Sequence, residues 1–491
     1  MGILRFCRMA VFVVVLLSGV GCGWAQATAV FPCPDGAKTA TVDPVVSQVV
    51  REVNSLVRVD DMDKALSLVT ENIASHPGNS RLEAARGRVL YRRGQLKEAI
   101  DAFNLAIELD PCNGRAHYDA WRVNAMAGAY QAAQQQLEIA HVVSPNVGLF
   151  QRVWRNTQMA LPEGVVADDP PHFNFYARHY DCDGIMVRAA SVVNPAALPV
   201  ACGHIRQMLE HLPRVRANMV ARGAELHIMG EDQAISDLPE DRNQRGERVF
   251  NQGGATGVSQ QKVDIDAAAG ATGGIYANCP EVNLLHMPGD GYGVHDEVCV
   301  HEFAHDIMGT GFDAAMRAEI ESVYKASMKK GLWKGAYAST NANEWWAEMS
   351  AWYFGAQGGV GKMEPPVPAA GPEALKAYDL GAFALLDRLY SGQKQPRVVT
   401  IHEIQPVKEV EGGTGANPDP AETLFVNNTP VRQYLEWVDR QGGSHKAGLV
   451  EPYDRLLYPC YMHQYWMVMD PRTRGYKLFT VTDPESQVTI N

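Results

Sequence analysis

Three prolines at a constant interval constrain the fold of this chain more than any other feature. Pro77, Pro111 and Pro145 follow one another at steps of 34 residues. A small residue stands twelve positions before each proline, and these residues are Ala65, Ala99 and Ala133. Proline cannot continue a helix, and small side chains let two helices approach closely. The spacing therefore predicts an array of stacked helical hairpins over residues 46–148.

The middle repeat, Ser80–Asn113, carries the most complete pattern. Its helix-packing positions hold Leu90, Phe103 and Ala106, and the glycines that repeat at the same period are Gly94 and Gly128. The pattern resembles the tetratricopeptide repeat over about three units, although Val53 and Trp121 stand where glycine is usual. The resemblance implies a peptide or protein partner on the concave face. An unrelated array of helical hairpins would have almost the same shape.

A region of mixed helical and strand patterns follows the repeats. Proline, glycine and aspartate in residues 150–171 predict a linker. The local patterns then predict a helix at 201–211, a strand at 224–229, a loop at 237–257, a second strand at 282–286 and a turn at 288–291.

The segment His301-Glu302-Phe303-Ala304-His305 carries the clearest chemical signal. Residues four apart lie above one another on a helix, so both imidazoles face the same way and can bind one zinc ion. Glu302 follows one step round the helix, where its carboxylate can take a proton from a water molecule at the metal. The motif by itself is moderately specific, and the alternative is a pair of surface histidines on an ordinary helix.

A third metal ligand distinguishes these alternatives. The metzincin pattern is excluded, because Met308 and Gly311 stand where that pattern needs glycine and histidine. A carboxylate on a second helix fits better, since Glu344 and Glu348 fall on one helical face. Asn341 or Asn343 can cap the start of this helix.

The segment Tyr337–Glu348 resembles the corresponding part of the anthrax lethal factor peptidase domain and its relatives. Residues 283–290 and 331–335 extend the likeness, which spans about residues 170–395. The resemblance implies an α+β zincin-type metallopeptidase domain with one zinc ion per chain. It makes Glu344 the third ligand beside His301 and His305. It also implies that Tyr337 stabilises the oxyanion and that Glu348 lies in the outer shell of the metal.

Two departures from this family leave the ligand set intact. A position near His286 often holds cysteine in the family, and Trp345 and Trp346 stand where phenylalanine or tyrosine is more usual. The favoured function is therefore a zinc peptidase acting on peptide or protein substrates. Two alternatives remain, namely a non-catalytic protein-binding scaffold with a structural zinc and an amidase of cell-wall peptides.

The C-terminal residues change character again after a glycine- and proline-rich stretch at 407–423, which predicts a second linker. Short alternating strands over residues 421–491 predict a small all-β sandwich, and this part resembles the β domain of the von Hippel–Lindau protein. The resemblance makes Trp437, His463 and Trp466 candidate binding residues. His463 lies three rather than two positions before Trp466, which favours the alternative that these aromatic residues fill the core.

The net charge indicates which kinds of partner the chain can bind, and its hydropathy indicates where it is located. The chain of 491 residues has a net charge of −12 and a pI of about 5.7, so nucleic acid is not an expected partner. Residues 1–27 combine Arg5 and Arg8 with an uncharged apolar run and a small-residue cleavage site, which predicts an export signal. A lipid anchor at Cys22 is the minority alternative to a secreted or periplasmic protein. No other segment is expected to cross a membrane.

Seven cysteines follow the predicted export signal, and none forms a CxxC motif, so a thiolate metal cluster is not expected. Export permits disulfides, and an odd number leaves at least one thiol unpaired. Cys182 and Cys202 are the predicted pair.

Overall fold

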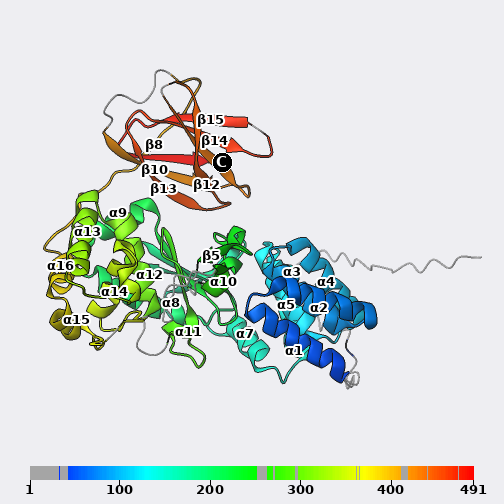
Figure 1. Cartoon of the computed structure of the whole chain (residues 1–491). Helices are drawn as coiled ribbons and strands as arrows, with labels where there is room; N and C mark the ends of the chain where they lie inside the picture. Colours follow the sequence, from blue (N-terminus) through cyan, green and yellow to red (C-terminus); the bar gives the residue numbers. More distant parts are fainter. Residues whose placement is uncertain are drawn as a thin grey trace, which may run out of the picture.

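The computed structural model describes residues 33, 43–250, 262–268, 271–292, 297–360, 362–363, 365–410, 419–439, 441–473 and 475–491. Figure 1 shows a helical array in blue and cyan beside a central region in green and yellow. A C-terminal β module in orange and red lies above the central region in this view. The predicted export signal at residues 1–27 lies outside the described residues.

The helical array contains three successive hairpins, formed by α1 Pro44–Arg58, α2 Met62–Ser75, α3 Ser80–Arg92, α4 Leu96–Leu109, α5 Gly114–Met126 and α6 Tyr130–Val143. Each repeated proline stands two residues after the end of a second helix, and the repeated alanines are at most 1% exposed. The glycines at the hairpin turns, Gly94 and Gly128, have φ angles of 74° and 75°. The tetratricopeptide-like repeats predicted from the sequence are therefore confirmed.

The predicted linker at residues 150–171 is wrong. Helix α7 occupies Gly148–Gln158, and strand β1 occupies Val165–His172. Phe150 and Val153 bury one face of α7, and the ring of Phe150 stacks on that of Tyr118 with centroids 4.3 Å apart. Pro170 and Pro171, two of the prolines that suggested a linker, lie in β1, which is an edge strand of its sheet and so tolerates the missing N–H groups.

A five-stranded sheet forms the first half of the central region, in the order β1-β2-β3-β4-β7. The pairs β1–β2 and β2–β3 are antiparallel, whereas β3–β4 and β4–β7 are parallel. The remaining strands span Tyr176–Cys182 (β2), Ile185–Ala190 (β3), Glu225–Met229 (β4) and Tyr276–Pro280 (β7). The predicted strand at 224–229 is thus confirmed as β4.

The second predicted strand, at 282–286, is instead the short helix α11, Glu281–Leu284. A short apolar run does not distinguish a strand from a buried helical turn. Here the buried carboxylate of Glu281 accepts hydrogen bonds from the backbone N–H groups of Asn194 and Glu231, at 2.6 and 2.7 Å. These bonds hold the start of the helical turn against two neighbouring loops.

Helices cover the sheet and form the rest of the central region. The longer helices are α8 Ala197–Leu209, α9 Pro213–Arg222, α12 Val298–Asp306, α13 Ala314–Lys329, α14 Ala342–Tyr353, α15 Pro372–Tyr378 and α16 Leu380–Tyr390. The short elements are η1 Ile235–Asp237, η2 Arg242–Gln244, β5 Arg248–Phe250, β6 Lys262–Asp264, α10 Ile265–Ala268, η4 Ile307–Gly311 and η5 Tyr337–Ser339. One hydrophobic core joins the sheet to α8, α12, α14 and α16. The predicted helix at 201–211 is confirmed as α8, which begins at Ala197 and ends at Leu209.

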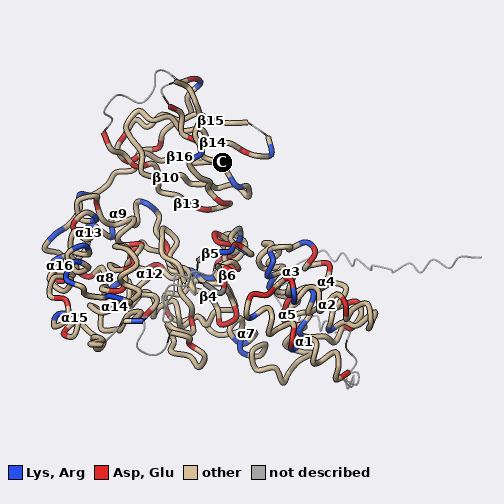
Figure 2. The backbone as a smooth tube through the Cα atoms, viewed as in Figure 1, with Lys and Arg blue, Asp and Glu red and all other residues tan. Residues whose placement is uncertain are grey.

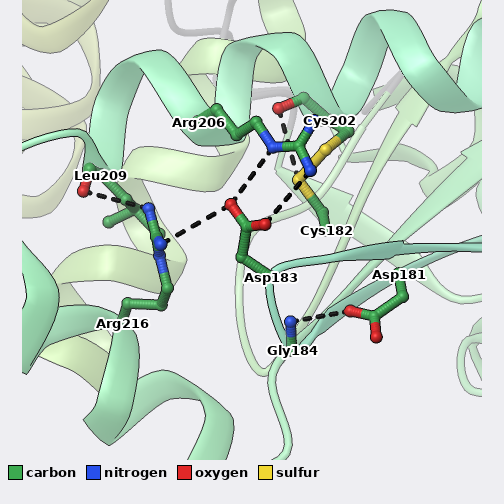
Figure 3. Close-up of a disulfide and its surroundings, with 8 residues drawn as sticks. All are labelled: Asp181, Cys182, Asp183, Gly184, Cys202, Arg206, Leu209 and Arg216. Atoms are coloured by element: carbon green, nitrogen blue, oxygen red, sulfur yellow. Dashed lines mark hydrogen bonds and ion pairs between the residues drawn. A yellow bond between two sulfur atoms is a disulfide. The ribbon is translucent and has the colours of Figure 1, made fainter.

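The disulfide between Cys182 and Cys202 ties the β2–β3 hairpin to α8 (Figure 3). Beside it, Asp183 forms ion pairs with Arg206 at 3.1 Å and with Arg216 at 3.6 Å. The predicted pairing is therefore confirmed. Two further disulfides join Cys33 to Cys112 and Cys279 to Cys299, and Cys460 is a buried free thiol.

The C-terminal module consists of two sheets, ordered β13-β10-β16-β8 and β12-β11-β14-β15-β9. Its strands are β8 His402–Glu403, β9 Pro406–Val407, β10 Pro420–Asn427, β11 Gln433–Val438, β12 Ser444–Val450, β13 Arg455–Tyr461, β14 Tyr465–Asp470, β15 Gly475–Thr480 and β16 Glu485–Ile490. Side chains from both sheets share one core, so the predicted two-sheet β module is present. The predicted linker over 407–423 includes residues 411–418, which lie outside the described residues, and its last residues already belong to β10.

Ion pairs and a ring contact join the C-terminal module to the central region. Glu422 of the C-terminal module pairs with Arg222 at 2.6 Å and with Arg317 at 3.0 Å in the central region. The rings of Phe173 and Tyr453 stack with centroids 5.6 Å apart.

Within the described ranges, none of the helices is long and apolar enough to cross a membrane.

Candidate metal centre

Helix α12, which carries the histidine pair, is held in place by its opposite face, which is buried. Val300, Phe303 and Ala304 are at most 2% exposed and belong to the central core. The indole N–H of Trp346 on α14 also donates a hydrogen bond of 2.9 Å to the backbone carbonyl of Ala304. These contacts fix the rotation of α12, so His301, Glu302 and His305 present their side chains in a defined direction.

Helix α14 supplies the carboxylates. Asn341 caps its start, because its side-chain oxygen accepts hydrogen bonds from the backbone N–H groups of Asn343 and Glu344, both at 2.9 Å. The sequence left open whether Asn341 or Asn343 is the cap, and the structure identifies Asn341. Trp345 and Trp346 are fully buried and anchor the helix, so that Glu344 and Glu348 face α12.

Three donor atoms meet between these helices. The Nε2 atoms of His301 and His305 lie 3.1 Å apart. The Oε2 atom of Glu344 lies 3.3 Å from the first nitrogen and 3.4 Å from the second. A zinc ion with ligands at about 2.0–2.1 Å in tetrahedral geometry needs donors roughly 3.3 Å apart. The three side chains therefore have the chemistry and the spacing to hold one zinc ion.

Glu348 orients the first of these ligands. Its Oε1 atom lies 3.0 Å from Nδ1 of His301. A proton on Nδ1 makes this contact a hydrogen bond and leaves Nε2 with the lone pair that a metal requires. The other carboxylate oxygen of Glu348 accepts a hydrogen bond of 2.5 Å from the backbone N–H of Gly359.

Burial and the neighbouring imidazoles shift the pKa values of Glu344 and Glu302 in opposite directions. Burial acts to raise the pKa of Glu344, but the imidazoles of His301 and His305 outweigh it and hold the pKa well below its usual range. Burial raises the pKa of Glu302, and the same two imidazoles oppose this effect. Glu344 is therefore the stronger candidate for an ionised ligand, whereas Glu302 is better placed to exchange protons.

Glu302 and Tyr337 border the three donor atoms. A carboxylate oxygen of Glu302 lies within 4.8 Å of ligand atoms of both His301 and His305. The Tyr337 ring lies over His301, with centroids 6.1 Å apart, and burial together with Glu344 raises the pKa of Tyr337 well above its usual value. The phenol therefore stays protonated and can donate a hydrogen bond. The nearby ring of Trp333 packs against those of Trp352 and Tyr378.

Three glycines that the sequence did not single out shape this centre. A Cβ atom at Gly273 would lie 2.3 Å from Cβ of His305, and one at Gly358 would lie 1.8 Å from Oε2 of Glu348. Gly359 donates to Glu348 and accepts a backbone hydrogen bond of 3.1 Å from Tyr337. The only signals in the sequence were the glycine pairs at 273–274 and 358–359.

The other polar residues near the motif have structural partners. Asp306 is fully buried and accepts a hydrogen bond of 2.6 Å from the Thr310 hydroxyl. Asp313 caps α13 by accepting from the backbone N–H of Met316 at 2.9 Å. Neither side chain belongs to the group of potential ligands, which among the described residues comprises His301, Glu302 and His305, with Glu344 beside them.

The candidate binding residues of the C-terminal module differ in their exposure. Trp466 has no exposed surface and packs against Phe425 and Tyr458. Trp437 is half-buried and stacks on His445 with ring centroids 4.2 Å apart, whereas His463 is exposed in the turn before β14. The alternative in which these aromatic residues fill the core therefore accounts for Trp466.

Comparison with known proteins bears on the repeats. No protein-family model matches the chain. A protein described as "Protein SGT1 homolog" from Oryza sativa subsp. japonica is 28% identical over 104 residues. This match covers 21% of the present chain and 28% of the rice protein, so the chain spans little more than a quarter of that relative.

Similar solved structures are those of tetratricopeptide repeat domains. The "TPR2B-domain:pHsp70-complex of yeast Sti1" is 22% identical, with a TM-score of 0.21, and covers 22% of this chain and 93% of that one. The "Second TPR of Spaghetti (RPAP3) bound to HSP90 peptide SRMEEVD" is 20% identical, with a TM-score of 0.19. This match covers 20% of the present chain and 91% of the other one.

Proposed function

We propose that this chain is a zinc-dependent endopeptidase, with one zinc ion held by His301, His305 and Glu344. The observation that carries the proposal is the triangle of donor atoms, with sides of 3.1, 3.3 and 3.4 Å. Its dimensions match tetrahedral zinc, and a mixed imidazole and carboxylate set is typical of catalytic zinc sites.

Two further side chains favour a catalytic over a structural zinc. A structural zinc site closes its coordination with four protein ligands and needs neither a proton acceptor nor a phenol beside it. Here three donor atoms, from His301, His305 and Glu344, form the triangle, and Glu302 and Tyr337 border it. A water molecule and a substrate carbonyl would complete the coordination of a zinc ion held by three protein ligands.

Each residue has a defined task in peptide hydrolysis. When bound, zinc would polarise the scissile carbonyl and acidify a water molecule. Glu302 accepts the proton of the attacking water and delivers it to the leaving amine. Tyr337 donates a hydrogen bond to the oxygen on which negative charge develops. Glu348 holds the His301 ring in one orientation through Nδ1, and Gly359 holds Glu348.

Export and protein binding complete the proposed function. The three disulfides support folding in an oxidising compartment, in agreement with the export signal predicted at residues 1–27. The repeat array is proposed to bind a protein partner or a part of the substrate, because arrays of helical hairpins present extended binding surfaces.

A cleavage assay with a fluorogenic peptide library tests the proposal. The purified chain should cleave peptides, should lose this activity when a chelator removes the metal, and should regain it on addition of zinc. A chain that holds zinc but cleaves no peptide would instead support a scaffold with a structural zinc. Hydrolysis confined to cell-wall peptides would support an amidase.

A further inference from the structure

A buried carboxylate that the proposed mechanism does not use lies at the junction of α15 and α16. These helices lie beside α13 and α14, on the side of the central region away from the repeat array (Figure 2). Asp379 is 1% exposed, and its Oδ1 atom caps α16 by accepting a hydrogen bond of 3.0 Å from the backbone N–H of Ala382. Its Oδ2 atom accepts two more, from the hydroxyl of Ser327 at 2.6 Å and from the indole N–H of Trp333 at 2.9 Å. Asp379 therefore connects α13 and α16 to Trp333.

Both N–H groups of Trp333 are bound at this junction. Tyr378, the last residue of α15, accepts a hydrogen bond of 3.1 Å from the backbone N–H of Trp333 through its hydroxyl oxygen. The Tyr378 ring also packs edge-on against the indole, with centroids 4.7 Å apart. Since Asp379 binds the indole N–H, two consecutive residues fix the backbone and the side chain of Trp333 together.

The backbone of Trp333 has an unfavourable conformation. Its φ angle is 60°, in the left-handed region that bulky side chains rarely adopt. Gly331 and Gly335 on either side have φ angles of 76° and 82°, but they have no side chain to clash. Such a conformation in a bulky residue persists only where the surrounding structure imposes it, and it is commonest at functional sites. The hydrogen bonds to Tyr378 and Asp379 supply this constraint.

Trp333 lies at the start of the short segment that carries Tyr337. The Trp333 carbonyl accepts a hydrogen bond of 3.0 Å from the backbone N–H of Ala336, which closes a tight turn. Tyr337 follows directly, and its own N–H donates to the carbonyl of Gly359 at 3.1 Å. The Tyr337 ring then lies over that of His301. The segment is thus held at Trp333 on one side and at Gly359 on the other.

We propose that Trp333 is a positioning residue for Tyr337, and that its hydrogen bond to Asp379 holds the phenol beside the metal centre. The inference rests on the role of Tyr337 in the proposed peptidase. In that role the phenol meets an oxygen on which charge develops only during the reaction, so a small displacement lowers kcat more than it weakens substrate binding. A Trp333 that only filled the core would contribute to stability without acting through Tyr337.

Trp333→Phe tests the inference, because it keeps a buried aromatic ring and removes the indole N–H. The variant should retain zinc and lower kcat by about 5- to 30-fold, with KM nearly unchanged. In a Tyr337→Phe background the same substitution should change kcat by less than about twofold, because the group through which it acts is already absent. Steady-state kinetics and zinc analysis of the parent, the two single variants and the double variant measure this cycle.

Ser327→Ala is the matched control. It removes another buried hydrogen bond to the same Oδ2 atom of Asp379, but the donor belongs to α13 and not to the segment that carries Tyr337. The control should lower the melting temperature about as much as Trp333→Phe does and should leave kcat unchanged. Equal losses of kcat in these two variants, or an undiminished effect of Trp333→Phe in the Tyr337→Phe background, would overturn the inference.

Hydrogen–deuterium exchange tests the placement of the segment without depending on catalysis. The backbone N–H of Tyr337 should exchange faster in Trp333→Phe than in the parent chain, whereas Ser327→Ala should leave its rate unchanged. Tyr378→Phe removes only the hydroxyl that binds the backbone of Trp333, so it should have the same effect even if Trp333→Phe does not fold. A parent chain that cleaves no peptide would refute the proposed function, whereas unchanged exchange at Tyr337 in these variants would refute the present inference.

Discussion

The repeat array and the metal centre differ in the side chains that they bring together. The array brings helices together through small apolar residues that recur every 34 positions, and its repeated alanines have almost no exposed surface. The metal centre gathers polar side chains from α12, α14 and η5 into a partly buried space. Changes in the array should therefore reduce the free energy of unfolding, whereas changes in the centre should reduce metal binding or catalysis and leave the fold intact.

The largest expected effect is a loss of kcat in the variant Glu302→Gln, without a loss of zinc or of stability. Glu302→Gln should retain zinc and the wild-type melting temperature, because Glu302 is not one of the three converging donors. It should lower kcat by about 10²- to 10⁴-fold, because the variant has lost its proton acceptor. Steady-state kinetics with zinc analysis measure both properties.

Glu321→Gln is a matched control, because Glu321 is 54% exposed on α13 and pairs only with Lys325 at the surface. It should change neither kcat nor zinc content. Wild-type kcat in the Glu302→Gln enzyme would remove the basis of the proposed mechanism.

The next effect concerns Tyr337, which lies at the edge of the centre. Tyr337→Phe should lower kcat by about 10²- to 10³-fold and leave KM nearly unchanged, because the hydroxyl contacts the substrate oxygen only as charge develops. Tyr324→Phe is the control, because the Tyr324 hydroxyl donates to the carbonyl of Ser339 in the same short helix, at 3.0 Å. The control should alter stability slightly and spare kcat. Equal loss of kcat in both variants would make the role of Tyr337 structural.

The C-terminal module tests whether its aromatic residues behave like a core or like a binding site. Trp466→Ala should lower the free energy of unfolding by about 3–5 kcal/mol, because the side chain is fully buried. Trp437→Ala should cost less, because Trp437 is half-buried. Chemical denaturation of the full chain, followed through the module's own transition, measures the difference. A larger loss for Trp437 than for Trp466 would contradict the assignment of Trp466 to the core.

The smallest effect probes helix packing in the array. Gly87→Ala improves helix propensity by about 1 kcal/mol, but its new Cβ atom would lie 2.5 Å from the Phe103 ring. The clash should dominate and destabilise the array by about 1–3 kcal/mol. Gly203→Ala in α8 is the control, because no atom lies within 4 Å of its added Cβ. That substitution should be neutral or stabilising in a thermal melt, and a stabilising Gly87→Ala would show that the hairpins pack loosely.

Different parts of these regions could be predicted from the sequence for different physical reasons. The array was predictable because a repeated unit repeats its signals, so prolines, glycines and alanines at a constant period supported one another. The helix carrying His301 and His305 was predictable because two ligands four residues apart need a helical backbone. Glu344 required the likeness to a known family, since spacing alone did not choose between it and Glu348.

The errors arose where tertiary contacts override local patterns. The run at 282–286 is apolar enough for a strand, but backbone N–H groups of distant loops bind Glu281 and favour a helical turn. Prolines at 170 and 171 suggested a linker, although an edge strand accommodates them. The roles of Gly273 and Gly358 depend on close approach to His305 and Glu348, which no local pattern reveals.

Zinc content, measured by mass spectrometry on the purified full chain, tests the central claim most directly. The wild-type chain should hold one zinc ion, and His301→Ala, His305→Ala and Glu344→Ala should each lose it, because each removes one of three converging donors. Glu321→Ala should keep full occupancy as a surface control. Full zinc occupancy in Glu344→Ala would contradict the proposed ligand set and would make Glu348 the candidate third ligand.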